Sequence, residues 1–245
     1  GQSNMEMTVS GSKDVDQEKA AAGLPKLRMF TVKRKTAETP QEECEGQWQV
    51  CSSQTVGAFS ATAYFFGREL HKELGVPVGM INSSWGGTPV QAWTSLAVQK
   101  KLPALEPMLQ QWEKNIASYD PATAKARYEK ALAAWKEKAA KAKAAGKRAP
   151  RRPRGPVDPR QSPHRPGSLY NGMIAPLVPY AMRGAIWYQG ESSAGRYNAG
   201  LYGLQLRAMT TNWRSVWGQG DFAFLWVQLP NFRDPQQQPS EPTGW

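Results

Sequence analysis

Residues 76–93 read VPVGMINSSWGGTPVQAW, and they carry the clearest fold signal in the chain. The short apolar run Val76–Ile81 predicts a buried β-strand, with Pro77 near its start, where a missing N–H is best tolerated. Before it, over residues 55–74, apolar side chains fall three or four positions apart, which predicts a core-facing helix about twenty residues long. Gly75 marks the end of that helix. A helix followed by a buried strand and then by a polar loop is typical of parallel α/β construction.

The same alternation extends to both sides of this stretch. Short apolar runs predict three more strands, and a helical pattern lies between the last two. The strands are Leu27–Val32, Gly184–Tyr188 and Phe222–Val227, and the helix is Tyr197–Trp217. We therefore expect an α/β body formed by residues 1–97 and 166–245, into which residues 98–165 are inserted.

The inserted segment differs in kind from the body. Asp120 followed by Pro121 is typical of a helix start, with an N-cap residue and then proline at the first helical position. The Ala/Lys-rich run that follows predicts a helix that ends at Gly146. Lys147–Pro166 is rich in Pro and Arg, so we expect an extended connector there. The helix should carry one narrow apolar seam, made of Tyr128, Leu132, Trp135 and Ala139.

The net charge of +11 comes from the insertion alone. Residues 98–165 hold 17 Lys and Arg against 6 Asp and Glu, whereas the rest of the chain holds 14 of each. A basic arm on a neutral body indicates a local accessory surface rather than a protein that binds nucleic acid as a whole. Two interpretations of the arm stay open, namely a solvated helix face, which is the commoner origin of such runs, and a surface that contacts a polyanion.

Length and composition exclude several classes of protein. A chain of 245 residues can bury a sizeable core, which excludes a peptide toxin. An apolar content of 40% is too high for a wholly disordered chain. No apolar run approaches the roughly 18 residues that a membrane helix needs, so we expect no membrane span. The chain begins with Gly rather than Met, which predicts that its natural amino terminus was removed together with any export signal.

The cysteines and histidines indicate no metal or other cofactor. Cys44 and Cys51 lie seven positions apart, which is neither a Cys-x-x-Cys pair nor a zinc pattern. A small disulfide loop and two buried free thiols both remain open for them. His71 and His164 have no partner at ligand spacing.

Three polar loops, each of which contains glycine, carry the candidate catalytic residues. In GQSNM, residues 1–5, Ser3 is placed like a nucleophile on a tight turn. In the second loop, residues 82–93, adjacent glycines let the backbone approach a bound group and aim an N–H at it. In WYQGESSAG, residues 187–195, Gln189 and Glu191 supply an amide donor and a carboxylate.

Each loop also has a plain structural interpretation. Short Gly-x-Ser sequences are most often turns, Thr88 is suited to cap a strand-to-helix turn, and a buried loop needs polar side chains for its own hydrogen bonds. The positions of the three loops taken together are more informative than any one loop. Two of the loops directly follow predicted strands, and GQSNM stands where a strand would end. In open α/β sheets, ligands bind beyond the carboxyl ends of the strands. The sequence therefore predicts that the three loops converge on one site.

Three segments of the sequence, in order, resemble the sialate O-acetylesterase-like branch of the SGNH hydrolase superfamily. They are GQSNM, the run from FSATAYFFGREL through GVPVGMINSSWGGTPVQAW, and LYNGMIAPLVPYAMRGAIWYQGESSAG. The resemblance covers essentially all of residues 1–97 and 166–245. It implies a flavodoxin-like three-layer α/β/α sandwich with a five-stranded parallel sheet. It also implies a secreted or periplasmic enzyme that removes O-acetyl groups from carbohydrates.

The resemblance implies a role for the residues of each loop. Ser3 becomes the nucleophile, and the oxyanion hole consists of the N–H of Ser3, the N–H of Gly87 and the side chain of Gln189. Gly86 is the neighbouring candidate for the second donor. The expected reaction is acyl transfer through an acyl-enzyme at Ser3.

The remaining matched positions imply support for a loop or for the substrate. We expect this role for Glu191, for Asn4 and for Gly86. The family usually reads QGESN, so Ser193 stands here in place of an Asn that contacts substrate.

The catalytic base is missing from the sequence. The family supplies it from an Asp-x-x-His motif near the carboxyl end, and no such motif occurs in the chain. His71 lies at a helix tail and His164 in the connector, where surface roles are expected. The final EPTGW, residues 241–245, resembles the lead-in to the segment before that motif, and only two residues precede Ser3, so the first strand is also missing. We therefore expect an incomplete piece of the esterase that is marginally stable and inactive by itself.

Two alternatives belong to other functional classes. A non-catalytic carbohydrate-binding module would use some of the 10 Trp as sugar platforms. Most of them should instead be core residues, because Trp85, Trp93, Trp187 and Trp226 lie in or beside predicted buried elements. The second alternative makes the basic insertion the main functional surface, docked on an anionic polymer.

Overall fold

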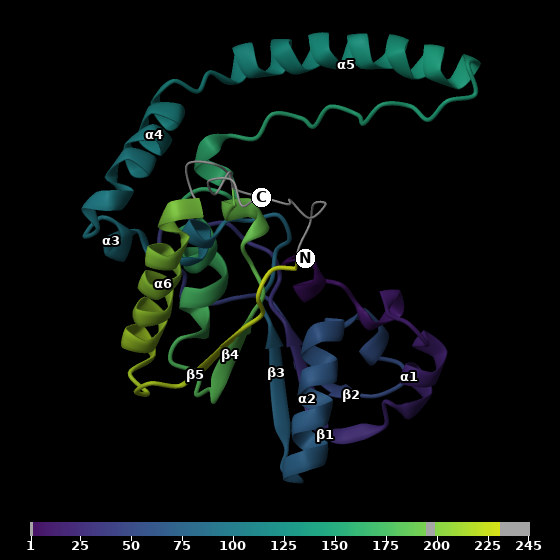
Figure 1. The fold of residues 1–245 in the computed structure, drawn as a ribbon, viewed down its shortest axis with the longest axis vertical. Coiled ribbons are helices and arrows are strands. Elements are labelled where there is room, and N and C mark those ends of the chain that lie inside the picture. Colours follow the sequence, from purple (N-terminus) through teal and green to yellow (C-terminus); the bar gives the residue numbers. More distant parts are fainter. Residues whose placement is uncertain (1, 195–198, 231–245) are drawn as a thin grey trace, which may run out of the picture.

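The computed structural model is a mixed α/β structure that describes residues 2–194 and 199–230 (Figure 1). The expected helix start at Tyr197 and the segment 241–245 lie outside the described residues. No helix within those limits is long and apolar enough to cross a membrane.

The first sheet has three strands in the order β2-β1-β3. Strand β1 pairs with β3 in parallel and with β2 antiparallel. Leu27 and Met29 on β1 are buried in a core that continues into the following helix. The expected strands at 27–32 and 76–81 are confirmed as elements, with β1 starting three residues earlier and β3 two residues later. The bounds are Leu24–Thr31 for β1, Gln49–Cys51 for β2 and Val78–Asn82 for β3.

Helix α2, Ala61–Leu74, packs directly over this sheet. A Cβ on Gly67 would lie 2.6 Å from Met80, so glycine permits the close approach of helix and strand. The predicted helix begins six residues later than expected, because Val56–Ala58 forms a separate 3-10 turn and the Ser60 side chain accepts the Ala63 N–H as the N-cap. It ends as expected at Gly75, which has a φ of 68° and donates its N–H to the His71 carbonyl.

The second sheet pairs β4, Gly184–Trp187, in parallel with β5, Ala223–Trp226. Helix α6, Tyr202–Trp217, connects the two strands. Aromatic side chains dominate its core, and the Trp213 Nε1–H donates to the Trp93 carbonyl at 3.0 Å. Trp226 was expected in this core and is instead 54% exposed. It lies on the same face of β5 as the buried Phe224, with ring centres 5.6 Å apart, but as the last residue of the strand it is covered on one side only.

The five-stranded parallel sheet implied by the resemblance is not formed by the described residues, which build two smaller sheets. Strand β2 is antiparallel to β1 because residues 32–48 join the two strands without a crossover helix. Strands β3 and β4 each pair with a single neighbour among the described strands.

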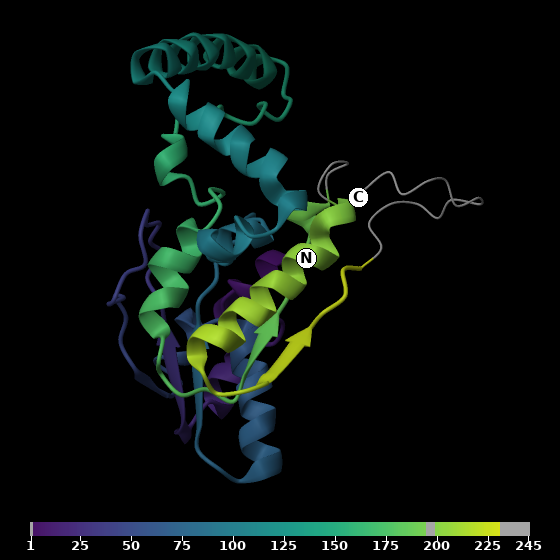
Figure 2. The same ribbon diagram turned by 90° about the vertical axis from the view of Figure 1, so that its left-hand side faces the viewer.

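The insertion rises from the body beside α6 and extends well beyond it (Figures 1 and 2). Helix α5 starts as predicted, with the Asp120 side chain accepting the Thr123 N–H at 2.7 Å and Pro121 in the first turn. Residues 147–158 are extended, although Pro159–Gln161 forms one 3-10 turn capped by Asp158. The insertion's helices are α3, Leu96–Gln99, α4, Glu106–Ala117, and α5, Pro121–Ala144.

Several elements carried no sequence signal that we recognised. They include α1, Val15–Ala21, together with β2 and α4, and a π-helical turn at Tyr170–Ile174. Gly172 in that turn lies against the backbone of Lys35, where a Cβ would stand 2.8 Å from the Lys35 carbonyl carbon. The turn is therefore held by a backbone contact far away in sequence.

Candidate active site

The N-terminal turn is anchored by the buried side chain of Gln2. This turn, Gln2–Met5, places Ser3 on the surface. The Gln2 backbone N–H donates to Glu191 Oε1 at 2.8 Å, and its Nε2 donates to the Thr88 carbonyl at 3.2 Å. These two bonds tie the residue before Ser3 to the second and third loops. Glu191 therefore contacts the N-terminal turn in this structure.

Further bonds of Gln2 fix the third loop. Its Oε1 accepts the N–H groups of Gly190 and Ser192 at 3.3 and 3.1 Å. Its Nε2 also donates to Ser192 Oγ at 2.8 Å. Because all polar atoms of the Gln2 side chain have partners, the turn that carries Ser3 is held in one orientation.

The second loop lies against the Ser3 hydroxyl. Ser3 Oγ stands 3.0 Å from the position that a Cβ on Gly86 would occupy, so no side chain fits there. Gly87 has a φ of 74° and is exposed, with open space where its Cβ would be. The two glycines thus have different functions, Gly86 allowing the close approach and Gly87 the left-handed turn.

The third loop is fixed through the buried amide of Gln189. Its Nε2 donates to the Thr88 carbonyl at 3.2 Å and to Ser193 Oγ at 3.1 Å. Ser193 Oγ also accepts the Val90 N–H at 3.4 Å, which links the third loop to the second. Tyr202 donates its hydroxyl to the Gln189 carbonyl at 2.6 Å, and burial raises the pKa of Tyr202.

The structure brings the three loops together, as the sequence predicts. The Thr88 carbonyl is the shared point, since it accepts from both Gln2 and Gln189. The Thr88 hydroxyl is not a helix cap. It donates to the Trp85 carbonyl at 2.6 Å and accepts the Trp93 Nε1–H at 3.0 Å. The N-cap position of the following turn is Pro89, which makes no side-chain cap hydrogen bond.

Two charged residues beside Ser3 were missed by sequence reasoning. The Glu6 carboxylate accepts the Gly86 N–H at 2.7 Å and forms an ion pair with Arg34. The Arg34 guanidinium also lies 5.5 Å from the ring centre of Trp85. No local pattern could reveal this cluster, because Glu6 and Arg34 are 28 positions apart and Gly86 is 80 positions from Glu6. The Gly86 N–H is thereby occupied, which leaves Gly87 as the better donor candidate.

Asn4 lies in the N-terminal turn of the site, whereas the two histidines lie elsewhere. The Asn4 carbonyl accepts the Thr62 hydroxyl at 2.9 Å, which ties the N-terminal turn to the start of α2. His71 lies at the other end of α2 and contacts the Val76 carbonyl at 2.7 Å. Burial, aided by the charge of Arg154, lowers the pKa of His164 in the connector. Within residues 2–194 and 199–230, no histidine forms a hydrogen bond with Ser3.

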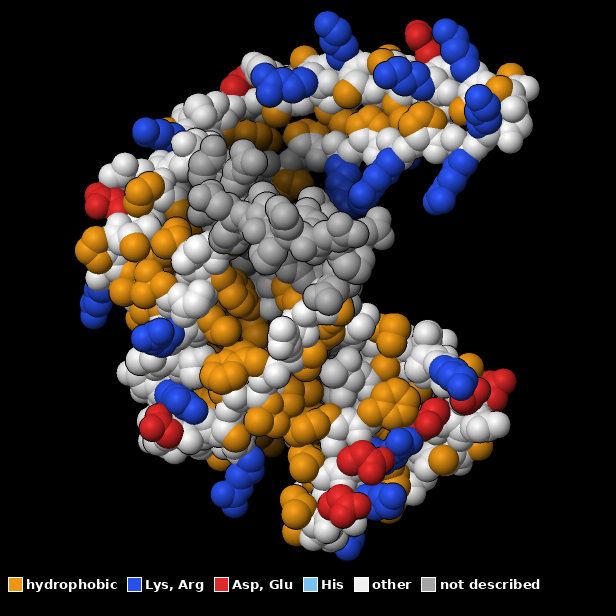
Figure 3. Space-filling model, in the orientation of Figure 1, with side chains coloured by type: hydrophobic (Ala, Val, Ile, Leu, Met, Phe, Trp, Pro, Cys, Tyr) orange, Lys and Arg blue, Asp and Glu red, His pale blue; other side chains and the backbone are white. Residues whose placement is uncertain are grey.

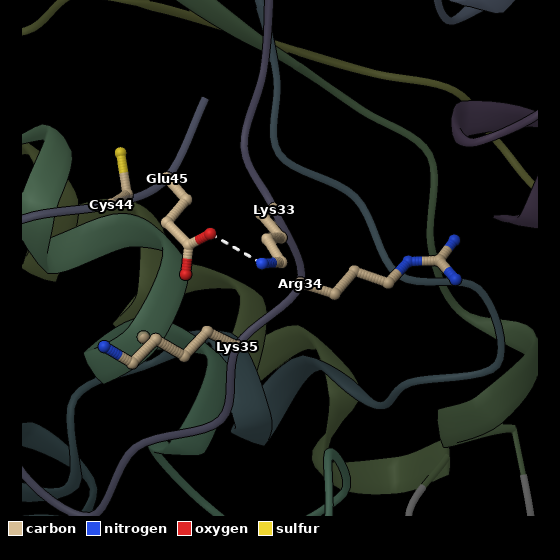
Figure 4. A pocket seen from close by; sticks show the side chains of 6 residues that line it. Lys33, Arg34, Lys35, Cys44 and Glu45 are labelled. Atoms are coloured by element: carbon tan, nitrogen blue, oxygen red, sulfur yellow. Dashed lines mark hydrogen bonds and ion pairs between the residues drawn. The ribbon is translucent and has the colours of Figure 1, made fainter. Parts of the chain in front are cut away.

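A small cavity of about 180 Å³ is lined by no residue of the three loops (Figure 4). Lys33, Lys35, Cys44 and Glu45 line it, and Lys33 Nζ contacts Glu45 at 2.5 Å. Arg34 points away from these side chains (Figure 4). Lys35 Nζ donates to Gln41 Oε1 at 2.9 Å, so both lysines of the cavity have partners within the protein.

The cysteines are free thiols in the structure. Burial raises the pKa of Cys51 to about 11 and raises that of Cys44 as well. Of the two interpretations of this pair, the structure shows the reduced one. The described part of the chain contains no cluster of three or more His, Cys, Asp or Glu residues suited to a metal ion.

Comparison with known proteins agrees with the three sequence motifs. No protein family model matches the chain. It is 30% identical to sialate O-acetylesterase of Rattus norvegicus over 95% of its length, and 29% identical to that of Homo sapiens over 94%. A carbohydrate acetylesterase from Xanthomonas citri superposes with a TM-score of 0.65 at 31% identity, over 94% of this chain.

These matches show that the chain is sialate O-acetylesterase-like, as its motifs predict. The chain spans only about two fifths of the proteins that it matches, namely 42% and 38% of the two esterases and 40% of the structural relative.

Proposed function

We propose that the protein is a serine esterase that removes O-acetyl groups from carbohydrates through an acyl-enzyme at Ser3. The observation that carries this proposal is the exposed Ser3 hydroxyl, packed against Gly86 where three loops meet. The names of the relatives, sialate O-acetylesterase and carbohydrate acetylesterase, support the choice of an acetylated sugar as substrate.

The reaction has two steps. Ser3 Oγ attacks the acetyl carbonyl carbon and its proton passes to a base, so that an ester bond forms to Ser3. The bond to the sugar oxygen breaks, and the sugar alcohol takes up that proton as it leaves. Water then attacks the acyl-enzyme in the same way, which releases acetate and restores the Ser3 hydroxyl.

The oxyanion formed in each step needs nearby donors. We assign this role to the N–H groups of Ser3 and Gly87 and to the Gln189 side chain. In the structure both Nε2 hydrogens of Gln189 are used, one of them by Ser193. Gln189 must therefore release the Ser193 hydroxyl to reach an oxyanion, and until then it acts as a clamp between the loops.

The base is the missing part of this machinery. Neither His71 nor His164 reaches Ser3, so we propose that an Asp-x-x-His segment outside the 245 residues supplies it. We also propose that the complete protein has the SGNH three-layer sandwich and acts outside the cytoplasm. The parallel pairing of β1 with β3 and of β4 with β5 supports this fold.

The test is Ser3→Ala in the complete gene product, with acetate release from O-acetylated sugars as the measurement. Loss of the nucleophile should lower kcat by at least about a thousandfold. Ser10→Ala, on the exposed turn that follows, is the matched control and should leave kcat unchanged. A labelled organophosphonate should mark the wild type and the control but not the Ser3 variant. Equal labelling or hydrolysis by all three proteins would reject the proposal.

A non-catalytic carbohydrate-binding module is the second candidate. The exposed Trp226 favours it, because an exposed indole ring can serve as a sugar platform. Sugar binding that Trp226→Ala abolishes, together with no organophosphonate labelling of the complete protein, would favour this candidate over the esterase.

A further inference from the structure

We propose that the basic insertion is an arm that binds an anionic polysaccharide and thereby delivers the O-acetyl groups of that polymer to the site around Ser3. The inference names the substrate class of the same site and in that respect rests on the proposed esterase function. The arm is defined as α5 and the connector up to residue 158.

The arm carries an excess of unpaired positive charge. Residues 121–158 contain 12 Lys and Arg against three acids, Glu129, Glu137 and Asp158. Of these cations, Lys125 alone forms an ion pair within the described residues, at 3.9 Å from Glu129. A helix that only needed solubility would mix charges of both signs, because like charges repel one another and oppose the folded arrangement. Unpaired charges that are all positive therefore favour a surface that binds a polyanion.

The arm is a built structure and not a loose tail. The connector runs back along α5, and the Trp135 Nε1–H donates to the Pro150 carbonyl at 2.8 Å. The Arg152 guanidinium lies 5.9 Å from the centre of the Trp135 ring. The apolar seam of α5 is thus half-buried under its own connector, and no residue of α5 is buried. The contact holds the cations of helix and connector together on one hairpin.

Both ends of the insertion are attached to the second loop of the site. The Gln91 carbonyl accepts the Gln99 Nε2–H at 2.9 Å, where the insertion begins, and the Gly167 N–H at 2.9 Å, where it ends. Gln91 is three positions after Thr88, the shared contact of the three loops. The insertion that carries the arm is therefore anchored on the loop that also shapes the site.

The arm also lies on the side of the body where the site opens. Figures 1 and 2 show α5 beyond the edge of the sheets at which the N-terminal turn lies. Figure 3 shows a wide hollow between the arm and the body, with Lys and Arg side chains of the arm projecting toward it. An extended chain in this hollow would meet the cations of the arm.

The aromatic residues favour a polysaccharide over a nucleic acid. Proteins that bind single-stranded nucleic acid combine basic grooves with exposed aromatic rings on which bases stack. The arm's two aromatic residues, Tyr128 and Trp135, are half-buried in the seam, and Trp135 is covered by the connector. Recognition by the arm is thus through charge, and the acetylated-sugar site beneath it selects a carbohydrate that carries carboxylate or sulfate groups.

The test compares binding and hydrolysis in the complete protein. The arm variant is Lys138→Gln, Arg148→Gln and Arg151→Gln together, at exposed positions without ion pairs. The matched control is Lys13→Gln, Lys26→Gln and Lys72→Gln, at exposed positions on the body. We expect the arm variant to bind polygalacturonate about tenfold more weakly at low salt, with a shallower salt dependence, and the control to bind normally. Neutral dextran should bind to neither.

Hydrolysis separates this inference from the proposed function. The arm variant should lose about tenfold in kcat/KM on O-acetylated polygalacturonate and nothing on 4-nitrophenyl acetate. Equal effects of arm and control variants, or tighter arm-dependent binding of single-stranded DNA than of polygalacturonate, would overturn the inference and leave the esterase intact. Arm-dependent binding of polygalacturonate without hydrolysis of either ester would instead reject the esterase and support the arm as a glycan-binding surface.

Discussion

At the scale of single residues, the contact between Ser3 and Gly86 is the feature most open to test. Gly86→Ala would place a Cβ 3.0 Å from Ser3 Oγ and still closer to the Glu6 carboxylate. The hydroxyl and the carboxylate must then move, and a nucleophile displaced by even a fraction of an ångström loses its alignment. We expect kcat for acetate release to fall by about a hundredfold.

A second glycine provides the control for this prediction. Gly203 lies on α6 with nothing within 4 Å of its Cβ position, so Gly203→Ala should leave kcat unchanged and stabilise the helix by up to about 1 kcal/mol. If Gly86→Ala retains full activity, the hydroxyl next to Gly86 is not the nucleophile.

Gln2 is a residue whose main effect should be on stability. Gln2→Ala removes side-chain bonds to Thr88, Gly190 and Ser192 and leaves buried groups without partners. We expect the free energy of unfolding, measured with urea, to fall by about 2–3 kcal/mol. Asn4→Ala is the matched control, because the exposed Asn4 side chain makes no hydrogen bond within the described residues, and it should cost less than about 0.5 kcal/mol. Equal losses in both variants would contradict the anchoring role of Gln2.

The sequence predicted which loops form the candidate site but not how they are joined. Ser3, Gly87 and Gln189 follow recognisable patterns of strand ends and glycines. Glu6 and Arg34 do not, because their role depends on a contact between segments that only the folded chain brings together. The buried bonds of Gln2 were likewise invisible, since a glutamine beside a serine carries no pattern of its own.

At the scale of elements, hydrophobic periodicity located strands β1, β3, β4 and β5 and helices α2 and α6 of the body, but it missed α1 and β2 and did not fix all of the ends. Helix α2 begins at Ala61 because Ser60 is the N-cap, which the apolar spacing from Val56 onward concealed. Strand β2 was missed because it is three residues long and mostly exposed, so it has no apolar alternation. Helix α5 was predicted well, since its Asp-Pro start is a local signal.

The N-cap of α5 predicts a pH dependence that is confined to the arm. The hydrogen bond from Thr123 lowers the pKa of Asp120 in the folded state. A carboxyl whose pKa is lower when folded contributes stability above its unfolded pKa, and that stability is lost as the pH falls through the folded value. Amide protection of the first turn of α5 should therefore decrease below about pH 4.

Asp120→Asn supplies the control for this effect. Asparagine also caps helices but does not titrate in this range, so the variant should keep the protection of the first turn as the pH falls. Hydrogen exchange followed by mass spectrometry, on a peptide covering residues 118–126, is the measurement. A wild type and an Asp120→Asn variant that lose protection at the same pH would show that the cap does not control the helix end.

At the scale of the whole molecule, the division of the strands into two separate sheets should lower the stability of the isolated 245-residue polypeptide. Strands β3 and β4 each have one strand partner among the described residues, and most of their residues are half-buried. Backbone groups on a half-buried open edge are neither fully hydrated nor paired in a ladder, which is unfavourable and promotes association with other strands. The body therefore has two incompletely satisfied edges at the centre of its fold.

We predict that the isolated 245-residue polypeptide unfolds at a lower urea concentration than the complete gene product and releases no acetate from O-acetylated sugars. Both effects have structural causes, because open edges lower the free energy of unfolding and a serine without a base is a weak nucleophile. Tryptophan fluorescence in urea reports the first effect, since Trp213 on α6 packs against Trp187 on β4 in the aromatic core. Similar unfolding midpoints would show that the edges need no further partner. Acetate release that depends on Ser3 in the isolated polypeptide would show instead that a base is already present within these residues.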